Sequence, residues 1–260
     1  MRILLRIIVL LALFFGTYFG LERLVVYPLD PRAIAPSDQR ITESKFGNMV
    51  IWTAPPKRGK PTVLYLHGNA GHIAKRTARF QRLMDRGYGL VAPALRGGNG
   101  SKGWPTEAGI TADIRALYPA LTSGQLTGTP TIPILYGESI GAAVAISLAT
   151  TSMPRPRAIV LEAPFTSLKD VAAYMHPQLP LATGLMLSRW PSLDRAPKLQ
   201  APLLILHGTK DDLIPIAMGR ALLAAAGSRQ KELYPVQGAG HINIWTGDAQ
   251  RRLYKFLKQF

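Results

Sequence analysis

The residues best suited to chemistry in this sequence surround Ser139, in the five-residue pattern Gly-Glu-Ser-Ile-Gly at 137–141. A short apolar run precedes the pattern and an alanine-rich segment follows it, which predicts a strand, a sharp turn and a helix. Such a turn holds a serine in an unfavourable backbone conformation, and its glycines leave room for the neighbouring strand and helix. The first helical N–H groups and the positive end of the helix dipole would also face a developing oxyanion. We interpret Ser139 as a candidate nucleophile; the alternative is an ordinary strand-to-helix turn that contains a serine.

A serine hydroxyl is a weak nucleophile at its own pKa, so it needs a base and a group that orients the base. Among the five histidines, His241 lies in a glycine-rich loop between a predicted strand and the last predicted helix. From that loop an imidazole can reach the turn. His67 and His207 each end an apolar strand before a glycine, where packing is the usual role, and His72 and His176 lack a supporting pattern. We therefore select His241 as the base.

The acid is expected between the serine and the histidine in chain order for this architecture. Asp211 meets this condition, because it follows the apolar strand predicted at 202–206 and so lies at the carboxyl edge of the sheet, where ligands bind. Its neighbour Asp212 is better explained as a solvated residue or a helix cap. Ser139, Asp211 and His241 each follow a predicted strand, so three independent placements agree.

The elements that must position these residues alternate between strands and helices along most of the chain, which predicts an α/β fold with a mostly parallel sheet covered on both faces. Strands are expected at 49–53, 62–66, 89–94, 131–136, 158–161, 202–206 and 232–234. Helices are expected at 74–86, 105–121, 139–149, 216–226 and 245–260, the first with its arginines mostly outward. We assign 46–260 to one catalytic domain, with residues 166–200 as a short helical cap inserted into it.

The first 24 residues are predicted to form an uncleaved transmembrane helix, followed by a proline-rich connector at 25–45. The apolar stretch approaches the roughly 20 residues that a membrane-spanning helix needs. A cleaved signal peptide is the alternative, but residues 16–20 place bulky side chains where a cleavage site needs small ones. Arg2 and Arg6 favour a cytoplasmic N-terminus, which places the rest of the chain on the outer, periplasmic or extracytoplasmic side.

The composition excludes several functional classes. The chain has 260 residues and a net charge of +16, but the basic residues are scattered and no nucleic-acid-binding motif accompanies them. An anionic membrane surface explains this charge better than nucleic acid does. The chain contains no cysteine, which rules out disulfides, a catalytic thiol and thiolate metal sites. We expect no metal or other cofactor, and a monomer.

From about Met49 to the C-terminus, the chain resembles the α/β-hydrolase superfamily, and within it the membrane-anchored Bem46-like serine hydrolases of the serine aminopeptidase S33 type. The resemblance rests on His-Gly-Asn-Ala-Gly at 67–71, Gly-Glu-Ser-Ile-Gly at 137–141, His-Gly-Thr-Lys-Asp at 207–211 and Gly-His at 240–241. It implies that Ser139 is the nucleophile, His241 the base and Asp211 its orienting acid. It also implies an oxyanion hole formed by the backbone N–H groups of Asn69 and Ile140.

The sequence departs from this resemblance in the loop Ala-Leu-Arg-Gly at 94–97. Relatives usually carry an acidic residue where Ala94 stands, so we expect Arg96 to be held more loosely here. Glu138, beside the nucleophile, occupies a variable position, and an indirect hydrogen-bonding role is expected for it.

The cap contains many apolar residues, which are expected either to receive an acyl chain or simply to pack onto the domain. Gly68, Tyr174, Leu185 and Trp190 are the candidate substrate contacts. A small cap favours ester, thioester or lipid acyl bonds, and therefore a small acyl substrate, with lipids among the candidates. An aminopeptidase or amidase acting on small peptides is the alternative, for which Glu162 is the acidic residue that could bind a free amine. A non-catalytic, membrane-anchored scaffold is the third possibility.

Overall fold

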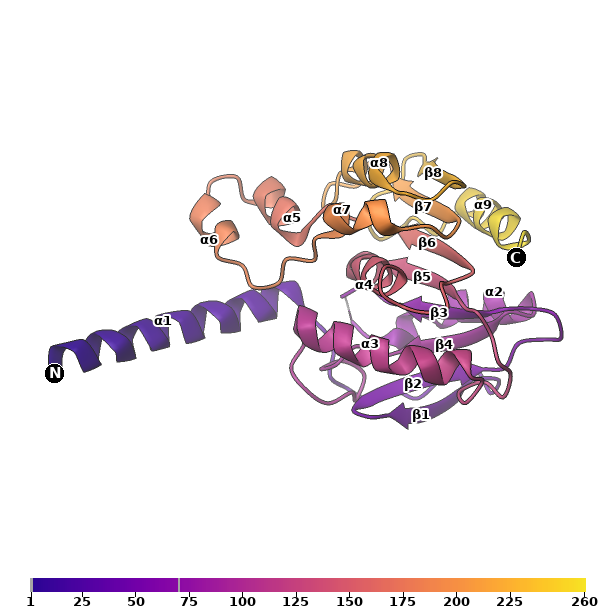
Figure 1. Ribbon diagram of the computed structural model, residues 1–260, viewed down its shortest axis with the longest axis horizontal. Helices are drawn as coiled ribbons and strands as arrows, with labels where there is room; N and C mark the ends of the chain where they lie inside the picture. The colour runs from indigo at the N-terminus through magenta and orange to yellow at the C-terminus, as the bar shows by residue number, and fades with distance from the viewer. Residues whose placement is uncertain (1, 70) are drawn as a thin grey trace.

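The computed structural model describes residues 2–69 and 71–260 as a long N-terminal helix joined to an α/β body. The helix, α1 (Arg2–Val26), projects away from the body, and only its C-terminal end meets it (Figure 1). Its segment Leu4–Val26 is long and apolar enough to cross a membrane. The helix therefore has the length and composition expected of a membrane span, and it continues two residues beyond the predicted boundary at residue 24.

The described residues of the body form an eight-stranded sheet with the order β1-β2-β4-β3-β5-β6-β7-β8. Its strands are β1 (Thr42–Phe46), β2 (Met49–Ala54), β3 (Thr62–Leu66), β4 (Gly89–Pro93), β5 (Ile134–Glu138), β6 (Ala158–Glu162), β7 (Leu203–Gly208) and β8 (Lys231–Val236). The pairs β1–β2 and β2–β4 are antiparallel, and all other pairs are parallel. This arrangement confirms the predicted fold class. Strand β1 was not predicted, because Thr-Glu-Ser-Lys-Phe is a largely exposed edge strand without an apolar pattern.

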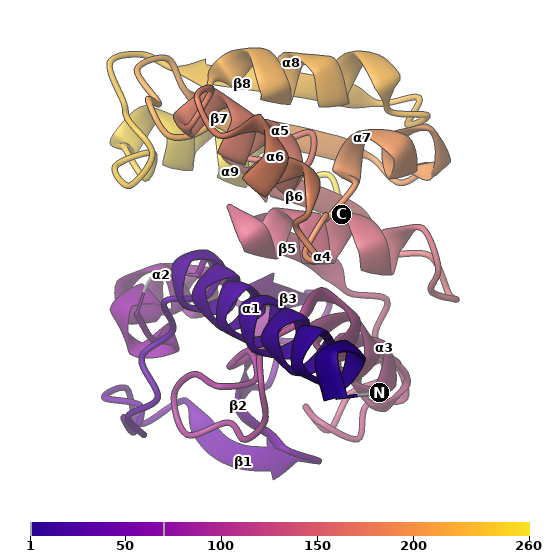
Figure 2. The same cartoon turned by 90° about the vertical axis from the view of Figure 1, so that its left-hand side faces the viewer.

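Helices cover both faces of the sheet. Their bounds are η1 (Ile73–Arg76), α2 (Thr77–Asp85), α3 (Glu107–Thr122), α4 (Ile140–Ala149), α5 (Leu168–Met175), α6 (Pro180–Gly184), α7 (Ser192–Arg195), η2 (Ala196–Lys198), α8 (Ile216–Ala225) and α9 (Gly247–Leu257). Helices α3 and α4 pack on one face, and α2 and α9 pack on the other (Figure 2). Successive side chains of each strand therefore enter two separate apolar cores, as the alternation of a strand requires.

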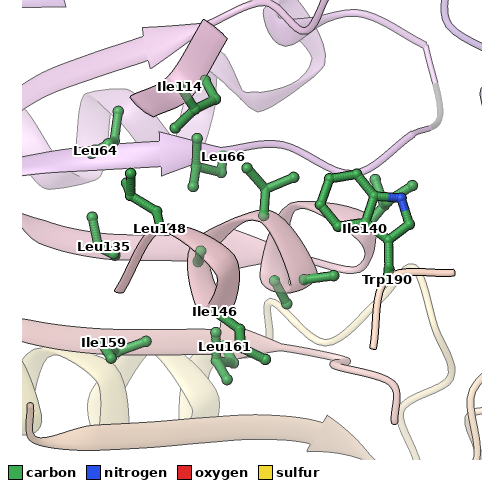
Figure 3. Close-up of a cluster of buried hydrophobic side chains, with 14 of the residues drawn as sticks. Leu64, Leu66, Ile114, Leu135, Ile140, Ile146, Leu148, Ile159, Leu161 and Trp190 are labelled. Atoms are coloured by element: carbon green, nitrogen blue, oxygen red, sulfur yellow. The ribbon is translucent and has the colours of Figure 1, made fainter. Parts of the chain in front are cut away.

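Helix α4 is buried on all sides, which explains why its sequence is apolar without a polar stripe. It packs between α3 and the parallel strands, with Ile146 and Leu148 close to strand residues such as Leu135 and Leu161 (Figure 3). Small residues at 141–143 and 145 let the helix approach the sheet closely. The turn at Ser139 thus leads into a helix that is buried along almost its whole length.

The predicted cap insertion contains α5, α6 and α7. Helices α5 and α6 lie on the side of the body from which α1 projects, whereas α7 packs against α4 and α8 (Figure 1). The cap leaves several large apolar side chains exposed to solvent: Tyr174, Met175, Leu179, Leu181, Leu185 and Leu187. These side chains are not used to stabilise the core, so the cap presents an apolar surface.

The close approach of Gly141 to the end of β3 allows a direct test of how α4 packs against the sheet. A Cβ at residue 141 would lie 2.6 Å from the carbonyl carbon of Leu66 and still nearer its oxygen. We expect Gly141→Ala to destabilise the protein by about 3 kcal/mol or more, because backbone atoms of β3 cannot move aside cheaply. The matched control is Gly184→Ala, where a Cβ would meet nothing within 4 Å. Thermal unfolding of both variants checks this; equal melting temperatures would contradict it.

Candidate active site

Ser139 lies at the tip of the turn between β5 and α4 with φ 54° and ψ −117°. This left-handed conformation is costly for a residue with a side chain, so the surrounding structure must impose it. The Ser139 N–H donates to the carbonyl oxygen of Glu162 at 2.8 Å, which ties the turn to the next strand. A Cβ at residue 137 would lie 2.5 Å from Cα of Ala142, so both glycines are needed for steric reasons, as predicted.

The structure brings together the three residues selected from the sequence. His241 Nε2 lies 3.1 Å from Oγ of Ser139, and His241 Nδ1 lies 2.9 Å from Oδ2 of Asp211. With the Nδ1 proton donated to Asp211, Nε2 is left as an acceptor for the Ser139 hydroxyl. The geometry is that of a nucleophile, a base and an orienting acid connected by hydrogen bonds.

Asp211 is fixed by the backbone that follows it. Its Oδ1 accepts hydrogen bonds from the N–H groups of Leu213 at 3.1 Å and Ile214 at 2.8 Å, and its side chain is fully buried. Burial alone would raise the pKa of Asp211, but the hydrogen bonds from His241 and Ile214 outweigh burial and lower this pKa. Asp211 is therefore an ionised, immobile acceptor for His241. Asp212, by contrast, is exposed.

Two cavities meet at Ser139. One has a volume of about 450 Å³ and is lined by charged side chains together with Gly68, Asn69, Ser139 and His241. The other has a volume of about 220 Å³ and is mostly apolar, with Phe165, Val171, Met175 and Met186 of the cap region in its wall. Because Asn69 and Ser139 belong to both linings, a molecule bound across them would place one end in each cavity.

The residues expected to form an oxyanion hole lie on either side of this junction. Ile140 begins α4, so its N–H is among the first helical N–H groups, which have no intrahelical acceptor. Asn69 lies in the loop between β3 and η1, and its side-chain Nδ2 donates to the carbonyl oxygen of Val26 at 2.8 Å. That bond holds the Asn69 side chain, so the loop is attached to the end of α1.

A buried ionic network lies under the polar cavity. Glu138 accepts hydrogen bonds from Arg76 at 2.6 and 3.1 Å and from the hydroxyl of Tyr65 at 2.9 Å. Burial would raise the pKa of Glu138, but the hydrogen bonds and charge of Arg76 lower it to about 2. The expected indirect hydrogen-bonding role of Glu138 agrees with these contacts. The expectation that Arg76 points outward was wrong, because the side chain turns inward to this carboxylate and is 7% exposed.

Glu162 completes the network on the adjacent strand. Its Oε2 accepts hydrogen bonds from Arg79 at 2.7 Å and from the hydroxyl of Tyr136 at 2.5 Å, and the side chain is 2% exposed. Arg79 also lies over the ring of Trp245. Arg79 therefore turns inward too, and the carboxylate of Glu162 already has a cationic partner.

Arg96 is held firmly, contrary to the expectation drawn from Ala94. Its Nε and Nη2 donate to the two carboxylate oxygens of Asp113 at 2.7 and 2.6 Å. Asp113 lies on α3, so the acid comes from a helix rather than from the loop. The sequence places Asp113 in the helix predicted at 105–121, but no sequence pattern links Asp113 to Arg96.

The four candidate substrate contacts occupy different surroundings. Gly68 lines the polar cavity. Tyr174 and Leu185 are exposed on the cap and belong to neither cavity lining. Trp190 is fully buried in the core, where its Nε1 donates to the hydroxyl of Tyr27 at 2.9 Å, so it does not line a cavity. Sequence reasoning missed Val25 and Val26, which line the apolar cavity.

Within residues 2–69 and 71–260, no group of three or more histidine, aspartate or glutamate side chains is arranged to hold a metal ion.

The buried side chain of His67 makes the stability of the protein depend on pH. Its Nδ1 lies 2.6 Å from the carbonyl oxygen of Gly68, and its Nε2 accepts from the N–H of Leu95 at 3.1 Å, which requires a neutral ring. Burial lowers the pKa of His67 to about 4, from 6.5. Stability from the neutral ring is therefore present above pH 6.5 and is lost as the pH falls toward 4.

We expect the free energy of unfolding to fall by about 2–3 kcal/mol between pH 6.5 and 4.5 through His67, with a further loss through His207, whose pKa burial also lowers. Denaturant unfolding of the detergent-solubilised protein at several pH values measures this slope. The matched variant His67→Gln should show a smaller slope over the same interval. An unchanged slope would contradict the assignment.

Comparisons with known proteins agree with the α/β fold described above. A family model described as "Serine aminopeptidase, S33" matches residues 57–194 and 192–244. The chain is 39% identical over 192 residues to an uncharacterized protein of Mycobacterium tuberculosis, covering 73% of this chain and 66% of that protein. It is 32% identical over 198 residues to protein bem46 of Schizosaccharomyces pombe, covering 73% and 64%. It is also 30% identical over 223 residues to the human alpha/beta hydrolase domain-containing protein 17B, covering 84% and 74%. The matched part thus spans about two thirds of these relatives.

Solved structures with the same fold include two enzymes. An esterase from Pyrococcus furiosus superimposes with a TM-score of 0.71 at 19% identity, covering 89% of this chain and 98% of the esterase. A soluble variant of monoglyceride lipase from Saccharomyces cerevisiae superimposes with a TM-score of 0.64 at 17% identity, covering 90% and 96%. At these identities the likeness concerns the fold. Together with the family match, the sheet order and the turn at Ser139, it shows that the chain belongs to the S33 serine aminopeptidase family of α/β-hydrolases, as a Bem46-like member.

Proposed function

We propose that this hydrolase cleaves carboxylic ester, thioester or lipid acyl bonds through an acyl-enzyme intermediate on Ser139. The observation that carries the proposal is the hydrogen-bonded series Ser139–His241–Asp211 at the junction of an apolar and a polar cavity. An acyl compound has the same division, because an apolar chain and a more polar leaving group flank one reactive carbonyl.

In the proposed reaction, His241 Nε2 removes the hydroxyl proton as Ser139 Oγ attacks the acyl carbonyl. Asp211 keeps the Nδ1 proton in place and stabilises the imidazolium that forms. His241 then gives its proton to the leaving group, and a water molecule deacylates the enzyme by the same steps in reverse order. The role of Asp211 is supported by its two backbone hydrogen bonds, which fix the carboxylate without neutralising it.

The backbone N–H groups of Asn69 and Ile140 are proposed to stabilise the oxyanion of the tetrahedral intermediate. Such donors act strongly because they are already oriented before charge develops, and loss of one costs about 10²–10³ in turnover in a well-studied serine protease. The start of α4 adds the positive end of the helix dipole at the same place.

The charges around the polar cavity argue against the aminopeptidase alternative. A free amine would need an unpaired carboxylate, but Glu162 is paired with Arg79 and Glu138 is paired with Arg76. Lys75 adds a further positive charge to the lining. We therefore favour neutral or anionic leaving groups over substrates that carry a free ammonium group. The ordered triad is likewise the feature that disfavours a non-catalytic scaffold.

We also propose that α1 is an uncleaved anchor with its N-terminus in the cytoplasm, so that the hydrolase domain at 46–260 lies on the outer side of the membrane. Helix length and the positions of Arg2 and Arg6 support this orientation. The proposed reaction draws its three triad residues from one chain, so it requires no residue from a second subunit.

The proposal is tested by the hydrolysis of p-nitrophenyl esters of increasing chain length, compared with aminoacyl anilides. We expect the esters to be preferred, and Ser139→Ala to lower kcat by about 10⁴-fold or more, because triad residues act as a unit. The matched control is Ser147→Ala. Ser147 is a buried serine on α4 that lies outside both cavities. This variant should retain activity.

Two results would contradict the proposal. A preference for the anilides would support the aminopeptidase alternative. Undetectable hydrolysis of all substrates by correctly folded wild-type protein, or equal activity in Ser139→Ala, would support a scaffold.

A further inference from the structure

We propose that the last turn of α1 is a wall of the acyl site, and that this site takes the acyl chain of a substrate resident in the same membrane as α1. This inference rests on the proposed acyl hydrolase function and specifies its substrate class. Within that turn it assigns the contact with the acyl chain to Val25 and Val26, which gives these two residues a role in substrate selection.

The end of α1 is joined to the cap by several hydrogen bonds. The carboxylate of Glu22 accepts from the N–H groups of Leu187 at 3.0 Å and Ser188 at 2.8 Å. The hydroxyl of Tyr27 contacts Ser188 Oγ at 3.2 Å and accepts from Nε1 of the fully buried Trp190 at 2.9 Å. A flexible tether would make no such contacts, so the helix end has a fixed place beside the cap.

The same helix end is joined to the loop at the proposed oxyanion hole. The side chain of Asn69 donates to the carbonyl oxygen of Val26 at 2.8 Å. The last carbonyls of a helix lack intrahelical partners, so Asn69 satisfies one that would otherwise be unpaired. Asn69 therefore links the position of α1 directly to the backbone proposed to stabilise the oxyanion.

Val25 and Val26 complete the apolar cavity that reaches Ser139. The lining of that cavity also includes Val171, Met175 and Met186 of the cap. An acyl chain in this cavity would thus lie between the membrane helix and the cap. Val25 is 75% exposed although it lines the cavity, so it stands at the boundary between the cavity and the exterior.

The exterior at this boundary is apolar. Leu181, Leu185 and Leu187 of the cap are 84%, 52% and 63% exposed. Helices α5 and α6 lie on the side of the body from which α1 projects, and both views agree on this placement (Figures 1 and 2). An exposed apolar surface continuous with a helix long enough to span a membrane fits a lipid bilayer as its partner.

An acyl chain that passes from the bilayer into this cavity would stay in apolar surroundings throughout. The geometry therefore points to acyl amphiphiles held in the membrane rather than to freely dissolved esters.

The test uses full-length protein reconstituted into phosphatidylcholine vesicles, with Val25→Asp as the variant and Leu24→Asp as its matched control. Leu24 is 63% exposed and does not line the cavity, so both variants place a carboxylate at a similar depth. The readout is the ratio of kcat/KM for p-nitrophenyl decanoate to that for p-nitrophenyl butyrate. We expect Val25→Asp to lower this ratio about tenfold or more, and Leu24→Asp to change it less than about twofold, because a charge beside an apolar chain must lose its hydration. Equal changes in the two variants would overturn the inference.

The route is tested separately with a two-chain acyl ester that exchanges slowly between vesicles. We expect wild-type protein to hydrolyse the ester in its own vesicles and to leave the ester in protein-free vesicles intact. Equal hydrolysis in both populations would overturn the membrane route. If hydrolysis of p-nitrophenyl butyrate depends on Ser139, but the variant comparison or the vesicle comparison gives its contrary result, this inference fails while the proposed function stands. If butyrate hydrolysis is absent, both fail.

Discussion

The close approach of α4 to β3 at Gly141 is the constraint on which the site depends. The carbonyl group of Leu66 occupies the space that any side chain at residue 141 would need, and Ala142 similarly crowds Gly137. This crowding forces Ser139 into its left-handed conformation and aims the start of α4 at the space in front of its hydroxyl. The apolar sequence of α4 follows from the same constraint, because the helix is enclosed by β3, β5, β6, α3 and α7. A strained turn persists only where its surroundings are this well packed.

Electrostatics then divide the space around Ser139 into two unlike halves. On one side, two buried carboxylates are compensated by Arg76 and Arg79, which leaves a polar lining with no unpaired acid. On the other side, the cap region and the end of α1 supply an almost wholly apolar lining. The division follows from the helices that deliver the side chains: α2 and its preceding turn bring the arginines, whereas α5 and α1 bring aliphatic groups. Asn69 lines both halves and connects them to the end of α1.

Much of the fold and of the candidate site was predictable from the sequence. The features that were not predictable share a physical cause. Periodicity and turn residues locate Ser139, Asp211 and His241, because strand ends and glycine-rich loops are local features. Partners far apart in sequence leave no such signal: Asp113 for Arg96, Glu138 for Arg76, and Val26 for Asn69 are all tertiary pairs. Trp190 shows a different failure: its place in the cap suggests a substrate contact, but the side chain is buried and bonded to Tyr27. The polar edge strand β1 lacked any apolar pattern and was missed for that reason.

We propose that His241 and Asp211 activate the hydroxyl of Ser139 as a nucleophile. Treatment with a fluorophosphonate, followed by mass spectrometry of proteolytic peptides, tests this activation without knowledge of the natural substrate, because the reagent phosphonylates an activated serine. We expect a single adduct on Ser139, formed by wild-type protein and lost when His241 is replaced by alanine. An adduct on another residue, or none on the folded wild-type protein, would contradict it.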